Sequence, residues 1–262
     1  MKIKILSKDE RKIKFVLEDA TPQFANALRR IMMSEVPVLA VDTVTFYNND
    51  SALYDEVMAH RFAMVPLWFD TKAFKRQDEC DCEGKGCSNC QIVFVVDKKG
   101  PVTILSKDMK SADAAVAKPV FDDVPIAELF EDQRLKAEAT AKLGLGKDHA
   151  KWQASRVWYS YYPVVEQKAK VTNGHEVEQA CPHNAVKVVD GKVEVGPDCD
   201  LSCHADKAAK PEGAFTLKGD DTKFVFTVES ISGLSAEEIV LQAADILKGK
   251  AKEFGKEVEG LK

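Results

Sequence analysis

The sequence predicts an α+β fold with a β-rich middle, and three observations support this prediction. Apolar residues alternate with polar ones near the N-terminus and in several later segments, which is typical of strands with one buried face. Two segments, 24–37 and the one after Ser235, instead place apolar residues every three or four positions, as amphipathic helices do. Residues 166–222 are rich in charged residues, Gly and Pro and hold three cysteines, which predicts a small inserted module.

Composition narrows the class of protein. The 262 residues can build a sizeable core, and 45% hydrophobic residues are ordinary for a globular protein. A net charge of −5 argues against a chain that wraps nucleic acid. No apolar run approaches the roughly 18 residues of a membrane span, and lysines interrupt any signal-peptide core near the N-terminus. Seven clustered cysteines argue against a secreted disulfide framework, so we expect metal chemistry in the cytoplasm.

The N-terminal elements are predicted by the alternating pattern and by capping residues. Strands are expected over 3–5 and 13–17, joined by a turn. Thr21 can accept a hydrogen bond from the first turn of the next helix. Pro22 suits the first helical position, because the N–H that proline lacks would have no helical partner there. The helix is expected to end at Pro37. Its apolar face consists of Phe24, Leu28, Ile31 and Met32.

Further strands and a second helix are expected along the chain. The strands cover 38–46, 92–96, 135–143, 157–164 and 224–228. The helix begins near Leu53 and ends before Pro66, since the residue before a proline disfavours the helical conformation. Residues 106–119 are small, polar or charged and predict a surface loop.

The last helix is predicted to be long and to begin at a capping box formed by Ser235 and Glu238. Its apolar seam consists of Val240, Ala243, Leu247, Ala251, Phe254, Val258 and Leu261. The helix would extend about 40 Å, which exceeds the width of a small domain, so we expect the seam to pack on a partner chain. The alternative is a helix that lies across its own sheet with a frayed end, because glycines weaken it.

The strongest chemical motif is a group of four cysteines within eleven residues. Its members are Cys80, Cys82, Cys87 and Cys90. Gly84 and Gly86 let the loop turn tightly enough for four sulfurs to face one point. Four thiolates around a tetrahedral ion form a structural zinc site that is closed to substrate. An iron–sulfur cluster with the same four ligands is one alternative to zinc. A second alternative is four free cysteines without a metal, although buried free cysteines do not suit charged, glycine-rich surroundings.

A second group of cysteines lies in the 166–222 module, where Cys181-Pro182 is similar to the end of a ferredoxin cluster motif. The other ligand positions of that motif are not cysteines, and Cys199 and Cys203 leave fewer than four ligands for any cluster. We therefore expect a degenerate ferredoxin-like fold without iron–sulfur clusters. The alternatives are a zinc ion bound by these three cysteines and His183, free thiols, or a disulfide between Cys181 and Cys199.

Several segments carry a resemblance to one known family. They are Phe24–Arg30, Ser34–Pro37, Leu53–Leu67, Gly146–Gln153 and Phe224–Ser230. In this order they resemble the D-type, α-like subunits of archaeal RNA polymerase, whose counterparts are the third-largest subunit of eukaryotic polymerase II and bacterial α. The resemblance spans nearly the whole chain, and its two long signatures, in the first and second predicted helices, are specific.

The resemblance implies a domain organisation and a set of partners. It implies a discontinuous dimerisation domain over 1–46 and 222–262, an insert domain over 47–165 with the metal loop at 80–90, and the degenerate ferredoxin-like module over 166–221. It further implies pairing with the small α-like subunit L and docking of subunits N and P and of the two large catalytic subunits. We expect DNA to be reached only through this complex, and no membrane. One structural zinc ion is implied for the loop.

No catalytic residue is expected in this chain. Nothing in the sequence supplies the acidic metal site of nucleotidyl transfer, so the resemblance implies a non-catalytic assembly subunit for transcription. Asn26, Arg29 and Arg30 are expected to contact partner subunits, because adjacent arginines on a packing helix favour charge-assisted contacts with carboxylates. Leu247 and Phe254 are expected to contact a partner from the last helix. The rival hypothesis is a soluble iron–sulfur electron carrier or redox sensor.

Overall fold

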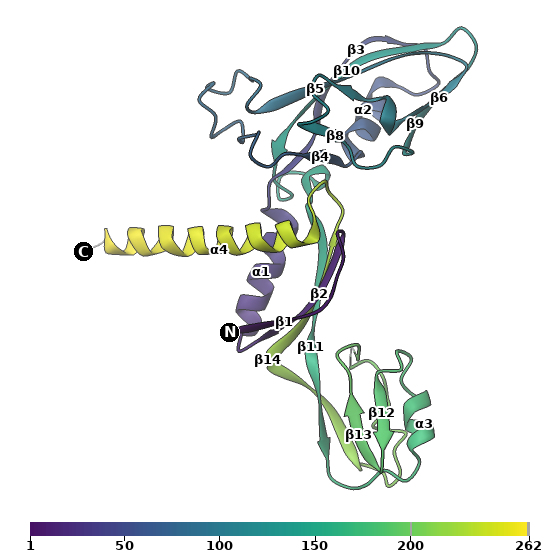
Figure 1. Ribbon diagram of the computed structural model, residues 1–262, viewed down its shortest axis with the longest axis vertical. Helices are drawn as coiled ribbons and strands as arrows, with labels where there is room; N and C mark the ends of the chain where they lie inside the picture. The colour runs from purple at the N-terminus through teal and green to yellow at the C-terminus, as the bar shows by residue number, and fades with distance from the viewer. Residues whose placement is uncertain (200, 261–262) are drawn as a thin grey trace. The chain divides into compact units, whose positions relative to one another are not determined.

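The computed structural model describes residues 1–199 and 201–260 (Figure 1). Within these ranges the chain forms four α-helices and fourteen strands, and it divides into two compact units. The first unit contains 1–9, 13–29 and 157–228. The second contains 10–12, 30–156 and the segment from 229 through the C-terminal helix. This mixed, β-rich architecture confirms the predicted α+β class, while the domain boundaries predicted above stay a prediction.

The first unit is built around a sheet with strand order β1-β2-β14-β11. Its strands are β1 Lys2–Lys8, β2 Lys12–Glu18, β14 Phe215–Ser230 and β11 Ser155–Gln167, the last three of which continue into the second unit. One face of the sheet is aromatic: the rings of Phe15 and Phe226 stack with centroids 5.2 Å apart, and Tyr159 lies 5.2 Å from Phe226. Burial of this face supplies the core of the unit.

Helix α1, Pro22–Ser34, follows β2 as predicted. The hydroxyl of Thr21 accepts a hydrogen bond from the N–H of Phe24 at 3.3 Å and so satisfies one of the free donors of the first turn. Phe24 is half-buried. The other three residues of the predicted apolar face are buried: Leu28, Ile31 and Met32. The apolar period of the sequence therefore identified the buried face of this helix correctly.

The small module in the first unit contains helix α3, Gly174–Gln179, and a hairpin of β12, Val186–Val189, and β13, Lys192–Val195. Its core is made of small apolar side chains together with three cysteines and Phe215. One short helix and one hairpin do not decide between folds, so the ferredoxin-like arrangement stays a prediction.

The second unit contains a sheet with strand order β3-β10-β5-β7. Its strands are β3 Val38–Asn49, β10 Arg134–Gly144, β5 Gln91–Lys99 and β7 Lys110–Ser111. Two smaller sheets pair β4 Leu67–Phe69 with β8 Ala117–Pro119, and β6 Val102–Leu105 with β9 Pro125–Leu129. Helix α2, Asp55–Met64, packs on β3 and buries Met58 and Phe62. All three strands predicted in this region are confirmed.

The prediction of a surface loop holds for 112–116, which form neither helix nor strand, but it was wrong for the two ends of the 106–119 segment. This segment contains a short 3₁₀ turn, Ser106–Asp108, and the strands β7 and β8. Ser106 is fully buried, and its hydroxyl donates a hydrogen bond to the Phe121 carbonyl at 2.5 Å and accepts one from the Val124 N–H at 3.1 Å. Pairing with distant strands gives the segment its structure, and a local polar composition does not reveal such pairing.

Helix α4, Ala236–Glu259, closes the described chain. Its predicted capping box is confirmed: the Ser235 hydroxyl accepts from the Glu238 N–H at 3.2 Å, and the Glu238 carboxylate accepts from the Ser235 N–H at 2.8 Å. The first turns bury Ile239 and Ala243, whereas every residue from 251 to 260 is exposed. Leu261 lies outside the described residues. No helix in the described ranges is long and apolar enough to cross a membrane.

Candidate metal centre and partner surfaces

Four sulfur atoms converge in the loop between β4 and β5, as the sequence predicted. The sulfurs of Cys80, Cys82, Cys87 and Cys90 all lie within 4.8 Å of one another. The Cys80–Cys87, Cys82–Cys90 and Cys87–Cys90 sulfur pairs are 3.5, 3.6 and 3.9 Å apart. A tetrahedral zinc site with bonds of about 2.3 Å requires sulfurs about 3.8 Å apart. The group therefore fits a single tetrahedral ion.

The backbone of this loop turns at residues that tolerate the left-handed conformation. Gly84 and Gly86 have φ angles of 79° and 84°, which non-glycine side chains rarely adopt. The Gln91 side chain also occupies the space where a Cβ at Gly86 would stand, with its Oε1 atom at 2.4 Å. Cys90 is fully buried and directly precedes β5. Through this cysteine the loop is tied to the sheet of the second unit.

The thiols of the loop differ in acidity because their surroundings differ. Burial raises the pKa of Cys82, but hydrogen bonds from the Gly86 backbone and from neighbouring thiols outweigh it and lower this pKa to about 7. Burial is the main cause that raises the pKa of Cys90 to about 12. A bound cation favours the thiolate of every ligand, so metal binding at this loop releases protons. Four protein ligands leave no open position for substrate, which makes such a site structural.

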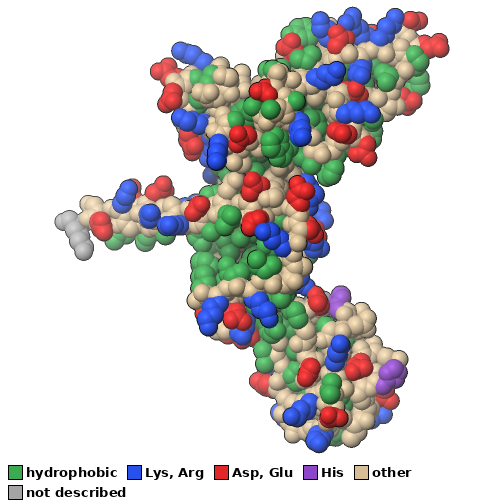
Figure 2. Space-filling model, viewed as in Figure 1, with side chains coloured by type: hydrophobic (Ala, Val, Ile, Leu, Met, Phe, Trp, Pro, Cys, Tyr) green, Lys and Arg blue, Asp and Glu red, His purple; other side chains and the backbone are tan. Residues whose placement is uncertain are grey.

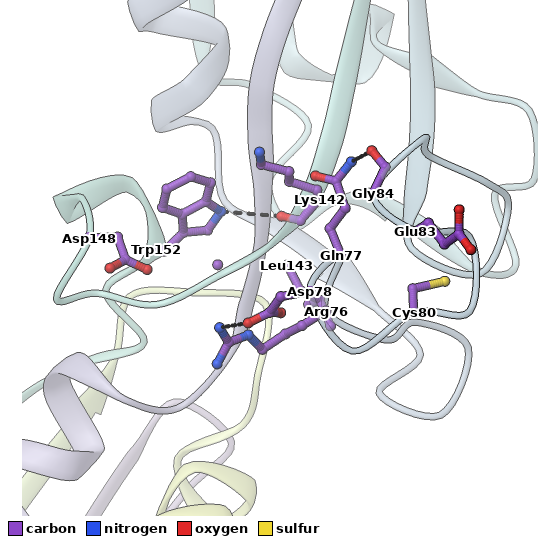
Figure 3. A pocket seen from close by; sticks show the side chains of 11 residues that line it. Arg76, Gln77, Asp78, Cys80, Glu83, Gly84, Lys142, Leu143, Asp148 and Trp152 are labelled. Carbon is purple, nitrogen blue, oxygen red and sulfur yellow. Dashed lines mark hydrogen bonds and ion pairs between the residues drawn. The ribbon is translucent and has the colours of Figure 1, made fainter.

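A cavity of about 670 Å³ lies beside the metal loop (Figure 3). Arg76 pairs with Asp78 at 2.5 Å, and the Gln77 side chain donates to the Gly84 carbonyl at 2.8 Å. Arg76 and Asp78 therefore engage each other, and Gln77 braces the metal loop. Among the described residues of this cavity we find no arrangement of a nucleophile with an adjacent base.

The segment 146–155, which includes the resemblance at 146–153, holds the end of α1. The N–H of Lys147 donates to the Ser34 carbonyl at 3.0 Å, and the Ser155 hydroxyl donates to the Met32 carbonyl at 2.7 Å. Both bonds satisfy groups near the C-terminal end of a helix, where carbonyls lack helical partners. A Cβ at Gly146 would stand 2.7 Å from the Met33 carbonyl oxygen. Close approach of this loop to α1 therefore requires glycine at 146.

The same segment is anchored by an ion-pair network that sequence analysis did not find. Asp42 on β3 contacts Lys142 at 2.8 Å and Lys151 at 2.6 Å. The ammonium group of Lys151 also lies 4.2 Å from the centre of the Trp152 ring, whose N–H donates to the Lys142 carbonyl at 3.2 Å. Burial raises the pKa of Asp42, but the two lysines outweigh burial and hold this pKa below its ordinary value of 3.8.

We expect the Asp42→Asn variant to lower the free energy of unfolding by about 1–2 kcal/mol at pH 7, because Lys151 then keeps a largely buried charge without a carboxylate. A lowered folded-state pKa stabilises the fold above the unfolded-state pKa of about 3.9, and this stabilisation is lost as the pH falls through the folded-state value. The difference from wild type should therefore shrink below about pH 4. Urea unfolding at pH 7 and pH 3.5 measures it.

The control for this prediction is Asp148→Asn, which removes an exposed carboxylate from the same segment. Its stability should stay within about 0.5 kcal/mol of wild type at both pH values. An equal destabilisation by Asp42→Asn at both pH values would contradict the electrostatic explanation.

The three cysteines of the small module are buried and unbonded in the described structure. Cys181, Cys199 and Cys203 are 2%, 1% and 7% exposed, and all three are free thiols. The sulfurs of Cys199 and Cys203 are 3.8 Å apart, and burial raises the pKa of Cys203 to about 11. His183, the fourth residue of the alternative zinc site, is exposed. In the described ranges, only the 80–90 loop gathers three or more potential metal ligands within 4.8 Å.

The predicted partner residues of α1 form a local hydrogen-bonded group. The Asn26 side-chain oxygen accepts from the Nε and Nη2 atoms of Arg29 at 3.2 and 3.0 Å. Arg29 is half-buried and Arg30 is exposed. Asn26 thus orients one guanidinium group at the helix surface, in a position where it can meet a carboxylate.

The predicted partner residues of α4 differ in exposure. Leu247 is half-buried, whereas Phe254 is 72% exposed and Val258 is 43% exposed. Hydrophobic side chains line one side of the helix end and charged ones the other (Figure 2). No described residue of this chain therefore packs over the outer half of the seam.

Comparison with known proteins places these features in one family. The family model of the RNA polymerase Rpb3/Rpb11 dimerisation domain matches residues 14–251. The chain belongs to this family. DNA-directed RNA polymerase subunit Rpo3 of Archaeoglobus fulgidus is 38% identical over 258 residues, which cover 98% of this chain and 97% of that protein. The Rpo3 proteins of Pyrococcus furiosus and Methanosphaera stadtmanae are 37% and 36% identical, over 100% and 96% of this chain and 98% and 96% of their own lengths.

Membership of the Rpb3/Rpb11 dimerisation-domain family confirms the resemblance found in the sequence. The rival hypothesis of a redox protein gains no support, since these three relatives are all named as polymerase subunits. The dimerisation-domain match also ends at 251. The exposed residues Phe254 and Val258 thus lie beyond the matched range, on the same continuous helix.

Proposed function

We propose that this chain is a non-catalytic assembly subunit of DNA-directed RNA polymerase. It pairs with a small α-like subunit, and the pair forms the platform on which the large catalytic subunits assemble for transcription. The observation that carries this proposal is the exposed apolar end of α4 in a chain of the dimerisation-domain family. Catalysis belongs to the large subunits, and this chain supplies contacts.

The physical argument for a partner begins with the stability of α4. Its outer turns, 251–259, have no buried residue, and Gly249 and Gly255 have open space where a side chain would stand. Two glycines cost about 1 kcal/mol each relative to alanine in a helix interior, and helical segments shorter than about 12–15 residues are marginal in water when nothing packs on them. A second subunit that covers Phe254 and Val258 supplies the missing tertiary stabilisation.

We assign the individual partner subunits that the resemblance implies. The small partner is subunit L, and subunits N and P and the two large subunits dock on the pair. In this assignment residues 1–46 and 222–262 form the dimerisation domain, 47–165 the insert, and 166–221 a degenerate module without an iron–sulfur cluster. The complex works in the cytoplasm and reaches DNA only as a whole. Native mass spectrometry of the affinity-purified complex tests this assignment, and a chain recovered only as a monomer contradicts it.

The metal loop has a structural role in this proposal. Cys80, Cys82, Cys87 and Cys90 hold one zinc ion, whose chemistry is to bind four thiolates and so fold a loop that has little apolar content of its own. Because Cys90 leads directly into β5, the ordered loop becomes part of the insert and is presented to partner subunits as a rigid surface.

The two arginines of α1 are assigned to the large subunits. We expect Arg29→Ala combined with Arg30→Ala to leave the pair with subunit L intact and to weaken recruitment of the large subunits by about tenfold or more, since each arginine can make charge-assisted hydrogen bonds with carboxylates. A pull-down with tagged subunit L, quantified for both large subunits, measures this effect. Lys4→Ala, on exposed β1, serves as a surface control. Full recovery of the large subunits with the double variant would refute the assignment.

A further inference from the structure

Strand β1 carries two exposed isoleucines on the apolar face of its sheet. Ile3 and Ile5 are 61% and 55% exposed. In the antiparallel register they stand opposite Leu17 and Phe15 on β2, which are 1% and 2% exposed. Residues directly opposite each other in a sheet point to the same face. The face that is buried at β2 therefore continues onto β1 and is left open there.

The edge of β1 is protected against the addition of another strand, but its face is not. The chain places lysines at 2, 4 and 8, and the register shifts between Ile5 and Ser7, so the strand carries a bulge or irregularity. Charged residues and bulges at an edge discourage strand pairing. Nothing comparable shields the two isoleucines. The arrangement favours a partner that packs on the face of the sheet over one that extends it.

We propose that Ile3 and Ile5, here called the β1 strip, are covered by the same small α-like subunit that pairs with this chain. This inference rests on the proposed function. The argument for this occupant is continuity: β1 is hydrogen-bonded to β2, and the dimerisation-domain match begins at residue 14 on β2. The strip thus extends the apolar face of the matched domain to residues that the family match does not include.

The area of the strip sets the size of the expected effect. Both isoleucines are more than half exposed, so a partner that covers them removes a substantial apolar area from water. Burial of apolar area contributes roughly 25 cal/mol per Å². Replacing both by threonine keeps the β-branched shape that strands favour and removes part of that apolar surface. We therefore expect the dissociation constant of the pair to rise about tenfold.

The test compares two variants of the full chain. Ile3→Thr/Ile5→Thr changes the strip, and Lys2→Thr/Lys4→Thr changes the opposite face of the same strand with the same residue type. Each chain is titrated with the purified small α-like subunit of the same organism, and the dissociation constant is measured by isothermal titration calorimetry. The thermal midpoint of each isolated chain is recorded as well. It should be unchanged in both variants, because all four residues are exposed in the isolated chain.

Each outcome decides the question. A tenfold weaker pair for the isoleucine variant, with the lysine variant within about twofold of wild type, supports the inference. Equal affinity for all three chains overturns it and leaves the proposed function standing. A wild-type chain that does not bind the small subunit overturns both. Weakened self-association of the isoleucine variant at unchanged affinity for the small subunit, measured by analytical ultracentrifugation, assigns the strip to a second copy of this chain and overturns the inference.

Discussion

The Cys82→Ser/Cys90→Ser variant is expected to purify with less than about 0.1 equivalent of metal, whereas the wild-type chain should hold one equivalent of zinc. Two thiolates cannot satisfy a tetrahedral ion, and the remaining pair binds it far more weakly. Because the ion supplies folding free energy to the loop, the thermal midpoint of the variant should fall by about 10 °C or more. Inductively coupled plasma mass spectrometry and calorimetry measure the two effects.

The matched control is Cys181→Ala, which removes a buried thiol from the small module. It should keep one equivalent of zinc, because that thiol lies outside the 80–90 group. Loss of the metal from this control, or a full equivalent of metal in the double variant, would show that the ion is bound elsewhere. If the wild-type chain holds one equivalent of iron, the four-cysteine site is supported but its ion is iron and not zinc.

Pairing with the small α-like subunit should weaken roughly 30- to 100-fold in the Phe254→Ala/Val258→Ala variant. Both side chains are exposed in the isolated chain, and covering them removes apolar surface that contributes about 2–3 kcal/mol to association. The unfolding midpoint of the isolated chain should change little, because neither residue is buried there. Titration with the small subunit gives the dissociation constant, and thermal unfolding gives the stability.

The control for the helix end is Lys252→Ala/Lys256→Ala. Each lysine stands two residues from Phe254, which places it about 160° around the helix from that ring at 3.6 residues per turn. Alanine keeps the helix propensity high, so pairing should stay within about threefold of wild type. If both variants weaken the pair equally, the effect comes from the helix as a whole and the seam has no special role.

Much of the fold could be predicted because its signals are local. The capping box at Ser235 and Glu238 and the apolar period of α1 involve residues within one or two helical turns, and both are confirmed. Strand positions followed from alternation over about five residues. The four-cysteine group was also a local signal, since its members lie within one loop and the turn residues between them bring the sulfurs together.

The features that escaped prediction all depend on residues far apart in the sequence. Asp42 meets Lys142 and Lys151 only because β3 pairs with β10 and the following loop folds back. Ser106 can be buried at low cost only because the carbonyl of Phe121, 15 residues along the chain, accepts its hydroxyl hydrogen bond. Neither set of contacts follows from a fixed spacing of residues, so no short stretch of sequence reveals it.

The sequence alone determined the family, the helices with their caps, most strands and the sulfur ligands, because each of these depends on neighbours a few residues away. Only the tertiary structure decided which parts of an apolar pattern are covered. Ala243 and Phe254 belong to one predicted seam, yet the first is buried and the second is exposed. Periodicity specifies the direction in which a side chain points, whereas burial requires another segment to arrive there, and that depends on the whole fold.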